Sequence, residues 1–324
     1  MERRVLVRWL VLLVILVAAF VTTVLTLNLT LYSAKGFVGS YLHTLSRGDT
    51  DGVLATNGVL RSDQATDELT APAALEHFDD IHLVSDTGNR DGTHTVVYGY
   101  AFGSEKGTTS FHVERSGSLL GLFSSWRFVT SPVSILQVTP QHDAAFTANG
   151  LDLVSPAGTG GPDKLLVFVP SRVALGHSST YLTATTKTVL VDRVGVSVAA
   201  DVDVRANRAF VREVQKELHT YLADCVTQKV LLPTGCPMGK QIADRIQDDP
   251  TWSMVTYPTV TIIPGDQPGS WLVPDTPATA HLVVTVKSIF DGTVSKLDED
   301  VPFTVRYLIT FQADGTPLIT AQYD

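Results

Sequence analysis

The sequence has few cysteines and a shortage of basic side chains, and it contains no complete catalytic motif. Only two of its 324 residues are cysteines, Cys225 and Cys236. A zinc site would need two further ligands close to them, and a dithiol redox site normally has the pattern Cys-x-x-Cys, so neither is expected. Basic residues number 24 against 33 acidic ones, which gives a formal net charge of -9. Because such a surface repels phosphates, nucleic-acid binding is not expected either.

Charged residues are absent from the stretch between Trp9 and Tyr32. As a helix with a rise of about 1.5 Å per residue, this stretch would be about 36 Å long, enough to cross a hydrocarbon core of about 30 Å. We therefore expect a transmembrane helix at residues 9–32. A cleaved signal peptide is the alternative, because Val17-Ala18-Ala19 offers the small residues that a signal peptidase accepts. Apolar residues continue through Leu31, beyond an ordinary signal core, and favour the membrane anchor.

Basic residues are concentrated before this helix. Arg3, Arg4 and Arg8 precede it, whereas only Lys35 follows it closely. This asymmetry predicts a cytoplasmic N-terminus, a single pass through the plasma membrane and an ectodomain outside. With Glu2 and the three arginines set aside, 21 basic and 32 acidic side chains are left, so the external part has a formal charge of -11.

The two cysteines fall in this external part, where oxidation is permitted. Cys225 and Cys236 are close in sequence and no third sulfur is left over. We expect a structural disulfide that closes a loop of about 12 residues and contributes about 2 to 3 kcal/mol to stability.

The hydrophobic periodicity after the membrane segment predicts helices followed by strands. Phe37, Tyr41 and Leu45 recur every four residues, which is typical of a helix, and Asp49 is suited to cap a second short helix. The segments that follow alternate between apolar and polar residues and predict an antiparallel sheet. Ser124–Val138 is expected to supply its last strand.

Short apolar runs rich in Thr, Val and Gly come next and predict a small β-sandwich. A helical stripe then returns, formed by Phe210, Val214, Leu218, Tyr221 and Cys225. Asn207 is a possible cap for this helix, a short helix is expected around Gln241–Ile246, and alternating strands follow from Trp252 onward. The whole chain is thus predicted to be α+β, in five parts: a cytoplasmic N-terminus (1–8), a transmembrane helix (9–32), a helix-plus-antiparallel-sheet module (33–139), a β-sandwich module (140–200) and a C-terminal α+β module (201–324).

Three motifs resemble chemical sites without completing one. The run GHSST lacks the second glycine of a nucleophile elbow and precedes a β-type segment, so Ser178 is interpreted as a turn serine. In HFDDIH, the spacing from His77 to His82 matches no familiar metal site and favours a solvated turn. The acidic run Asp298–Asp300 is interpreted as a solvated loop. No catalytic, cofactor-binding or metal-binding residue is predicted.

The first module carries a family resemblance. The segment AKGFVGSYLHTLSRGDTDGVLA and the strand SSWRFVTSP resemble the opening helix and a late strand of the NTF2-like superfamily, and the last module is similar to it in plan. A membrane helix followed by such modules is also similar to envelope proteins of Gram-positive bacteria, including the teicoplanin-resistance-associated membrane proteins. The chain differs from those proteins because it has no zinc-ribbon cysteines before the membrane. Since the NTF2-like fold hosts binding, scaffolding and catalysis alike, no catalytic residue is carried over.

The sequence therefore predicts a non-enzymatic, membrane-anchored binding or scaffold protein of the bacterial cell envelope, without a cofactor, whose partner is a cell-wall polymer or another envelope protein. The alternative is an NTF2-like pocket protein that binds or acts on a small apolar ligand, in a cavity lined by His94, Tyr98 and His112. A further alternative is a subunit of a membrane complex that contacts its partner through polar residues of the membrane helix, namely Thr22, Thr23, Thr26 and Asn28.

Overall fold

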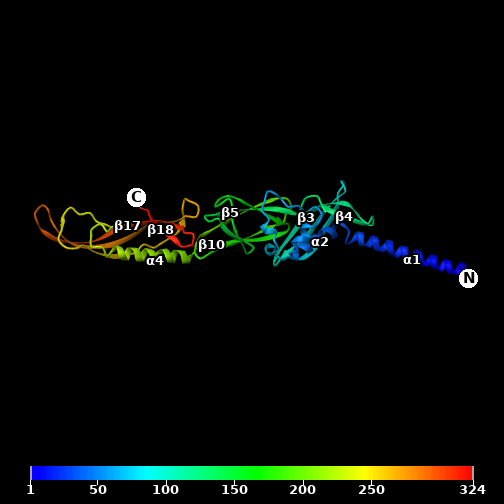
Figure 1. Cartoon of the computed structure of the whole chain (residues 1–324), viewed down its shortest axis with the longest axis horizontal. Helices are drawn as coiled ribbons and strands as arrows, with labels where there is room; N and C mark the ends of the chain where they lie inside the picture. Colours follow the sequence, from blue (N-terminus) through cyan, green and yellow to red (C-terminus); the bar gives the residue numbers. More distant parts are fainter. Residues whose placement is uncertain (1, 323–324) are drawn as a thin grey trace.

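The fold is an elongated mixed α+β arrangement with a long apolar helix at one end. The computed structural model describes residues 2–322, with side chains from residue 7 onward. Helix α1 (Glu2–Leu29) projects from one end, and the C-terminal sheet occupies the other (Figure 1). Within α1, the segment Val7–Leu29 is long and apolar enough to cross a membrane. The expected N-terminal apolar helix is confirmed.

Two helices and a four-stranded antiparallel sheet follow α1. Ser33 caps α2 (Ala34–Ser46) and Asp49 caps α3 (Thr50–Leu54), each by accepting a hydrogen bond from a backbone N–H of the first turn, as expected for Asp49. Two short 3-10 turns, η1 (Glu68–Thr70) and η2 (Pro72–Ala74), precede the sheet. The sheet has the order β1-β2-β3-β4, with strands β1 (Asp79–Gly88), β2 (Thr93–Phe102), β3 (Glu105–Leu119) and β4 (Phe123–Phe128).

Helix α2 packs on one face of this sheet. Val38 and Leu42 of the helix are fully buried, as are Val96 and Phe111 of the sheet. Because side chains alternate between the two faces of a strand, β2 turns its apolar residues toward the helix at every second position. These side chains form the first hydrophobic core.

The middle of the chain contains two sheets, with orders β11-β5-β8 and β12-β10-β9-β6-β7. Strands β5 and β11 run parallel, and the other neighbours run antiparallel. The strands are β5 (Val133–Gln141), β6 (Ala145–Ala148), β7 (Leu151–Val154), β8 (Asp163–Phe168), β9 (Ser171–Ser178), β10 (Leu182–Val191), β11 (Ser197–Asp203) and β12 (Arg205–Ala206).

The run Ser124–Val138, expected to form one strand of the first module, is divided between two sheets. Its first half belongs to β4, whereas its second half belongs to β5, which pairs with β8 and β11. Pro132 separates the two strands, because proline has no N–H to donate to a sheet. The single-strand prediction is therefore wrong, and β5 joins the middle sheets although it lies before residue 139.

Helix α4 (Arg208–Cys225) and a long sheet form the C-terminal region. The predicted cap is confirmed: Asn207 Oδ1 accepts hydrogen bonds from the N–H groups of Ala209 (2.9 Å) and Phe210 (3.1 Å). The sheet has the order β13-β16-β17-β18, with β14 and β15 also paired to β16. Its strands are β13 (Arg245–Ile246), β14 (Thr251–Thr256), β15 (Ile263–Pro264), β16 (Trp271–Lys287), β17 (Val294–Phe311) and β18 (Pro317–Ala321).

The expected short helix at Gln241–Ile246 is wrong. These residues form an irregular segment that ends in β13. Ile246 pairs with Val286 of β16, so this segment forms an edge strand next to the β16–β17 hairpin.

The buried side chains of the middle and C-terminal regions form one continuous cluster. It extends from Leu136 and Val167 in the middle sheets to Trp271 and Ile309 in the C-terminal sheet. The first module has a cluster of its own, which Phe168 of β8 joins. The residues that follow α1 therefore form two cores, with a junction between the first module and the rest.

Tyr41 of α2 makes a buried polar contact at this junction. Its hydroxyl lies 2.9 Å from the Val169 carbonyl oxygen and 3.1 Å from that of Pro132. Burial raises the pKa of Tyr41 well above its ordinary value, so the phenol stays protonated and its one proton is shared between the two carbonyls.

Arg172 of β9 makes a second contact across the junction. Its Nε donates to Glu76 Oε2 (2.8 Å) and its Nη1 donates to the Phe102 carbonyl (2.9 Å). The guanidinium also lies 5.5 Å from the centre of the Phe102 ring. The middle sheets are thus bonded directly to the end of β2.

We predict that Tyr41→Phe lowers the free energy of unfolding by about 1 to 2 kcal/mol, because the buried Val169 carbonyl loses its hydroxyl donor. The Pro132 carbonyl still accepts from the Val169 N–H at 2.9 Å. Chemical denaturation of the full-length protein in detergent measures the change. Tyr257→Phe is the matched control, since Tyr257 is 40% exposed and should have no effect. An unchanged denaturation midpoint for Tyr41→Phe would contradict the role of this contact.

Candidate binding groove

A groove lies between α4 and the last two strands of the C-terminal sheet. Its volume is about 520 Å³, within the range of about 300 to 1,000 Å³ that is usual for ligand sites. Its lining comes from α4, β17, β18, the segment before β10 and the loop that follows α4. Three separate stretches of the sequence therefore meet at this site.

The walls of the groove are largely apolar. Val214 and Leu218 of α4 face Ile319 of β18 across it. At one end, Tyr181 stacks on Phe311 with 5.9 Å between ring centres. At the other end, Tyr221 and Tyr307 meet edge to face at 6.4 Å. The tyrosine rings at both ends offer apolar surface together with a hydroxyl group, so they suit an apolar ligand that also makes a hydrogen bond.

Two carboxylates lie at the rim. Glu213 and Glu217 are one helical turn apart on α4, and their side chains are 37% and 53% exposed. Lys216, itself 70% exposed, lies 3.5 Å from Glu213 and 3.8 Å from Glu217. One exposed lysine thus faces two carboxylates, so these three side chains together carry a net negative charge.

A third carboxylate lies in the turn next to the groove. Thr316, which lines the groove, donates to Asp314 Oδ1 from its hydroxyl (2.6 Å) and from its N–H (3.0 Å). These hydrogen bonds hold the pKa of Asp314 below its ordinary value. Asp314 is therefore ionised at neutral pH and adds to the acidic character of this end.

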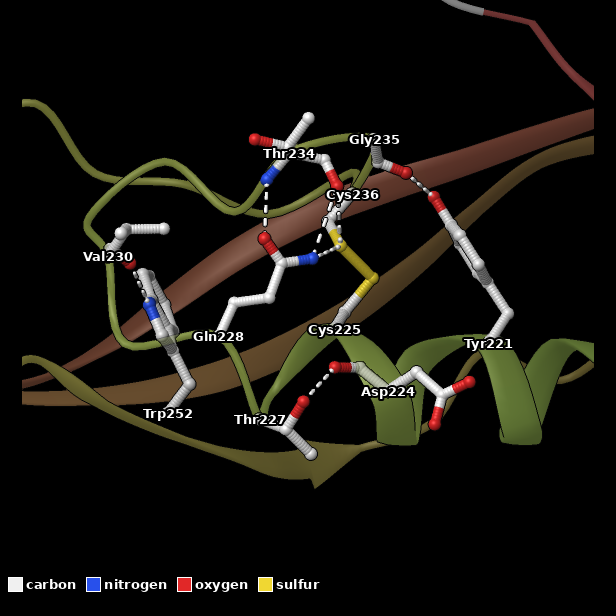
Figure 2. Close-up of a disulfide and its surroundings, with 10 residues drawn as sticks. All are labelled: Tyr221, Asp224, Cys225, Thr227, Gln228, Val230, Thr234, Gly235, Cys236 and Trp252. Carbon is white, nitrogen blue, oxygen red and sulfur yellow. Dashed lines mark hydrogen bonds between the residues drawn. A yellow bond between two sulfur atoms is a disulfide. The ribbon is translucent and has the colours of Figure 1, made fainter.

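The loop between the two cysteines closes one end of the groove. Figure 2 shows Tyr221 reaching from α4 to donate its hydroxyl to the Gly235 carbonyl. Both residues line the groove. The position of this wall therefore depends on how the loop is held.

Two side chains brace the loop (Figure 2). Gln228 Oε1 accepts from the Thr234 N–H at 2.8 Å, and Gln228 Nε2 donates to the Thr234 carbonyl at 3.1 Å. Trp252 of β14 donates from Nε1 to the Val230 carbonyl at 2.8 Å. The loop is thus fixed both across itself and to the sheet.

The predicted disulfide between Cys225 and Cys236 is confirmed, with 5.8 Å between the two Cα atoms. Cys225 is the last residue of α4 and is buried with the apolar stripe of that helix. The bond therefore ties the groove wall to the end of α4.

The residues predicted to line a pocket lie in the first module, away from the groove. His94 Nδ1 lies 2.7 Å from Asp86 Oδ1, and its ring meets Trp126 edge to face at 5.0 Å. The hydroxyl of Tyr98 donates to the Lys35 carbonyl at 2.9 Å. Both residues share the face of β2 that turns toward α2.

His112 lies on the opposite face of the sheet. Its strand neighbours Phe111 and Val113 are buried, whereas His112 is exposed. The structure thus brings His94 and Tyr98 to one face and leaves His112 on the other.

The other motifs singled out in the sequence occupy ordinary structural positions. Ser178 is the exposed last residue of β9, and strand β10 follows the turn. His77 Nδ1 lies 2.7 Å from the Ser46 carbonyl, and His82 Nδ1 lies 2.7 Å from the Asp80 carbonyl. Within residues 7–322, no group of three or more His, Cys, Asp or Glu side chains is arranged to hold a metal ion.

The acidic run Asp298–Asp300 is part of strand β17, so its interpretation as a loop is wrong. His281 of β16 lies opposite it, with Nδ1 2.8 Å from Asp300 and Nε2 3.0 Å from Asp298. A hydrogen bond to Asp300, together with the charges of both carboxylates, raises the pKa of His281. One carboxylate contacts each ring nitrogen of His281, and we call this cross-strand arrangement of His281, Asp298 and Asp300 the ion-paired ladder.

The sequence interpretation missed the groove. The only local signal was the pair Glu213 and Glu217, which flanks the apolar stripe of α4 at a spacing of four residues. The opposite wall, β18, lies about 100 residues further along the chain.

Comparisons with protein-family models, with curated proteins and with solved structures found no match to this chain. The function is therefore inferred from the geometry of the molecule itself.

We predict that replacing both cysteines (Cys225→Ala with Cys236→Ala) lowers the free energy of unfolding by about 2 to 3 kcal/mol, because the unfolded chain loses a closed loop of about 12 residues. Denaturation of the full-length protein measures the loss. Reductant should reproduce it in the natural chain and have no effect on the variant. Equal stability of the two proteins would show that Gln228 and Trp252 hold the loop without the bond.

We predict that His281 makes stability depend on pH. Because its folded-state pKa is raised, its contribution is fully present below the unfolded value of about 6.5 and is lost as pH rises through the folded value. The difference in Tm between the natural chain and His281→Asn should therefore be larger at pH 6 than at pH 8.5. Parallel Tm curves across this range would contradict the ion-paired ladder.

Proposed function

We propose that this chain is a membrane-anchored binding protein of the bacterial cell envelope that acts by recognition and not by catalysis. The observation that carries the proposal is the position of the groove. It lies between α4 and β18 in the C-terminal region, and Figure 1 shows these two elements on the side of the middle sheets away from α1. If α1 crosses the plasma membrane with its basic end in the cytoplasm, the groove is presented outside, away from the bilayer surface.

We propose an NTF2-like fold for the first module and a β-sandwich for the middle region. In support, two helices cover a four-stranded antiparallel sheet in the first module. In the middle, residues from both sheets, such as Leu136 of β5 and Val173 of β9, belong to one buried cluster. Both arrangements host binding proteins as well as enzymes, so they are compatible with the proposed role.

The chemistry of the groove favours a protein partner. Its walls offer apolar and aromatic surface, while Glu213 and Glu217 place negative charge at the rim. An apolar peptide segment with a basic residue matches both features. An anionic wall polymer does not, because the groove rim and the ectodomain as a whole are acidic. We therefore propose an extended segment of another envelope protein as the ligand.

The alternative pocket in the first module has less support. The space between α2 and the sheet is occupied by Val96, Tyr100 and Phe111, each at most 1% exposed. Tyr98 directs its hydroxyl to a backbone carbonyl instead of into open space. We place the binding site in the C-terminal groove for this reason.

Photo-crosslinking in intact cells tests the proposal. A benzoylphenylalanine in place of Ile319, which faces the groove, should give an adduct of discrete mass with an envelope protein. The same residue in place of Leu318, which is 49% exposed on the other face of β18, should not. Glu213→Gln with Glu217→Gln should lower the adduct yield roughly two- to fivefold, as expected when exposed charge pairs worth up to about 1 kcal/mol are lost.

Two results would contradict the proposal. Equal adducts from positions 318 and 319, or none from either, would remove the groove as the binding site. Retention of the purified protein on isolated cell walls, lost when their anionic polymers are stripped, would replace the protein partner by a wall polymer.

A further inference from the structure

The hairpin between β3 and β4 ends in an uncharged, apolar tip. No charged residue occurs between Arg115 and Arg127, and the sequence of the tip is Leu-Leu-Gly-Leu-Phe. Leu119, Leu120 and Leu122 are 54%, 82% and 44% exposed. Exposing such a group of leucine side chains to water is unfavourable, and contact with an apolar environment would stabilise it.

The backbone of the turn disfavours a leucine at position 120. Leu120 and Gly121 have φ values of 55° and 70°, and the Leu122 N–H donates to the Leu119 carbonyl at 3.1 Å. A two-residue turn with positive φ at both positions favours Asn-Gly, because a branched apolar residue is strained there. The same chain uses this favoured pair in the β6–β7 turn, at Asn149 and Gly150, with φ values of 47° and 81°.

The hairpin is bonded to the last turn of α1. Asn28 Nδ2 donates to the Leu122 carbonyl, and Asn28 Oδ1 accepts from the Ser124 N–H, both at 2.8 Å. Further along, Trp126 Nε1 donates to the Tyr32 carbonyl at 2.8 Å. The amide of Asn28 therefore pairs with the free edge of β4 as a neighbouring strand would.

These contacts give the direction of the tip. From Trp126 to Leu122, β4 runs from Tyr32 back to Asn28, that is, toward the apolar span Val7–Leu29. The turn at Leu120 follows in the same direction and lies on the membrane side of Asn28.

The exposure of α1 agrees with this direction. Residues 7–23 are all exposed, whereas Val24, Leu27 and Asn28 are partly covered on one face of the helix. Strand β4 packs against this end of α1. The hairpin thus lies along the last two turns of the span.

We propose that the tip of this hairpin enters the outer boundary of the lipid bilayer beside α1 and forms a second membrane contact. The inference rests on the proposed anchoring role of α1. The leucine side chains lie among the upper acyl chains, while the backbone of the turn stays at the headgroup level, because its free polar groups need water. The strained leucine and its exposure are both explained by this environment.

The chain offers an internal control at its other end. The β16–β17 turn exposes Ile289 and Phe290, and Phe290 is 98% exposed. This turn is the orange tip farthest from α1 in Figure 1, so a bilayer around α1 does not reach it.

Fluorescence quenching in lipid vesicles tests the inference. The only native cysteines are joined in the disulfide, so one new cysteine can carry a nitrobenzoxadiazole label in the full-length protein. Three variants are compared in phosphatidylcholine vesicles with doxyl groups at acyl carbon 5 or 12: Leu120→Cys, Phe290→Cys and Val17→Cys. We expect at least twofold quenching of the Leu120→Cys label by the shallow doxyl group and none of the Phe290→Cys label. The Val17→Cys label should be quenched most by the deep doxyl group.

The outcomes separate the two proposals. If the Val17→Cys label is not quenched, α1 does not span the bilayer and the anchor fails together with the hairpin. If that label is quenched while the Leu120→Cys label behaves like the Phe290→Cys label, the anchor stands and the hairpin inference is overturned.

A second variant removes the apolar side chain without harming the turn. Leu120→Asn introduces the residue that the turn favours, so Tm should stay equal or rise. A label at Ser118→Cys should nevertheless lose about half of its quenching by the shallow doxyl group in the Leu120→Asn background. Unchanged quenching would show that Leu120 does not hold the tip in the bilayer.

Discussion

The placement of the folded region that follows α1 depends on one side-chain amide, that of Asn28. It lies in the last turn of α1 and satisfies a carbonyl and an N–H on the free edge of β4 at the same time. An amide that left water without partners would cost several kcal/mol, so here the same bonds stabilise Asn28 and fix the hairpin against the helix. The stacking of Tyr32 on Phe123, with ring centres 4.5 Å apart, adds an apolar contact beside them. Instead of a flexible linker, a bonded corner joins the helix to the first module. The possible role of Asn28 in contacting another membrane protein is thereby reduced, because its polar groups are engaged within the chain.

The same principle continues outward from this corner. Tyr41 and Arg172 bond the first module to the middle sheets, and Phe168 of β8 packs into the first core. Beyond that junction, the middle and C-terminal regions share a single buried cluster. Packed interiors are stiff, and buried polar contacts resist separation because neither partner can find water. The groove between α4 and β18 is consequently carried on a connected body that extends from the base of α1.

Local features could be predicted from the sequence, whereas features made by distant segments could not. The apolar helix, the caps Asp49 and Asn207, the stripe of α4 and the disulfide each depend on residues within one short stretch of the chain, so periodicity and spacing were sufficient. The assignment of β5 failed because the run Ser124–Val138 contains two strands, β4 and β5, that belong to different sheets. Only the tertiary strand pairing distinguishes them. The groove forms only when α4 lies beside β18, which is distant in the sequence. The apolar hairpin tip could be interpreted only after the hydrogen bonds of Asn28 placed it next to the end of α1. The acidic run in β17 was misread because its charges are balanced by His281 across the strand pair, and no local pattern reveals that partner.

The elongated shape has a mechanical consequence. In a stiff body that is hinged at a surface, a small tilt at the base becomes a large sideways displacement at the far end, and the leverage grows with length. The elements that line the groove, α4 and β18, lie beyond the middle sheets as seen from α1 (Figure 1). If the hairpin tip contacts lipid as proposed, the contacts around Asn28 and Leu122 form the pivot of this body, and the lipid packing at the pivot would set how far the groove moves above the membrane surface.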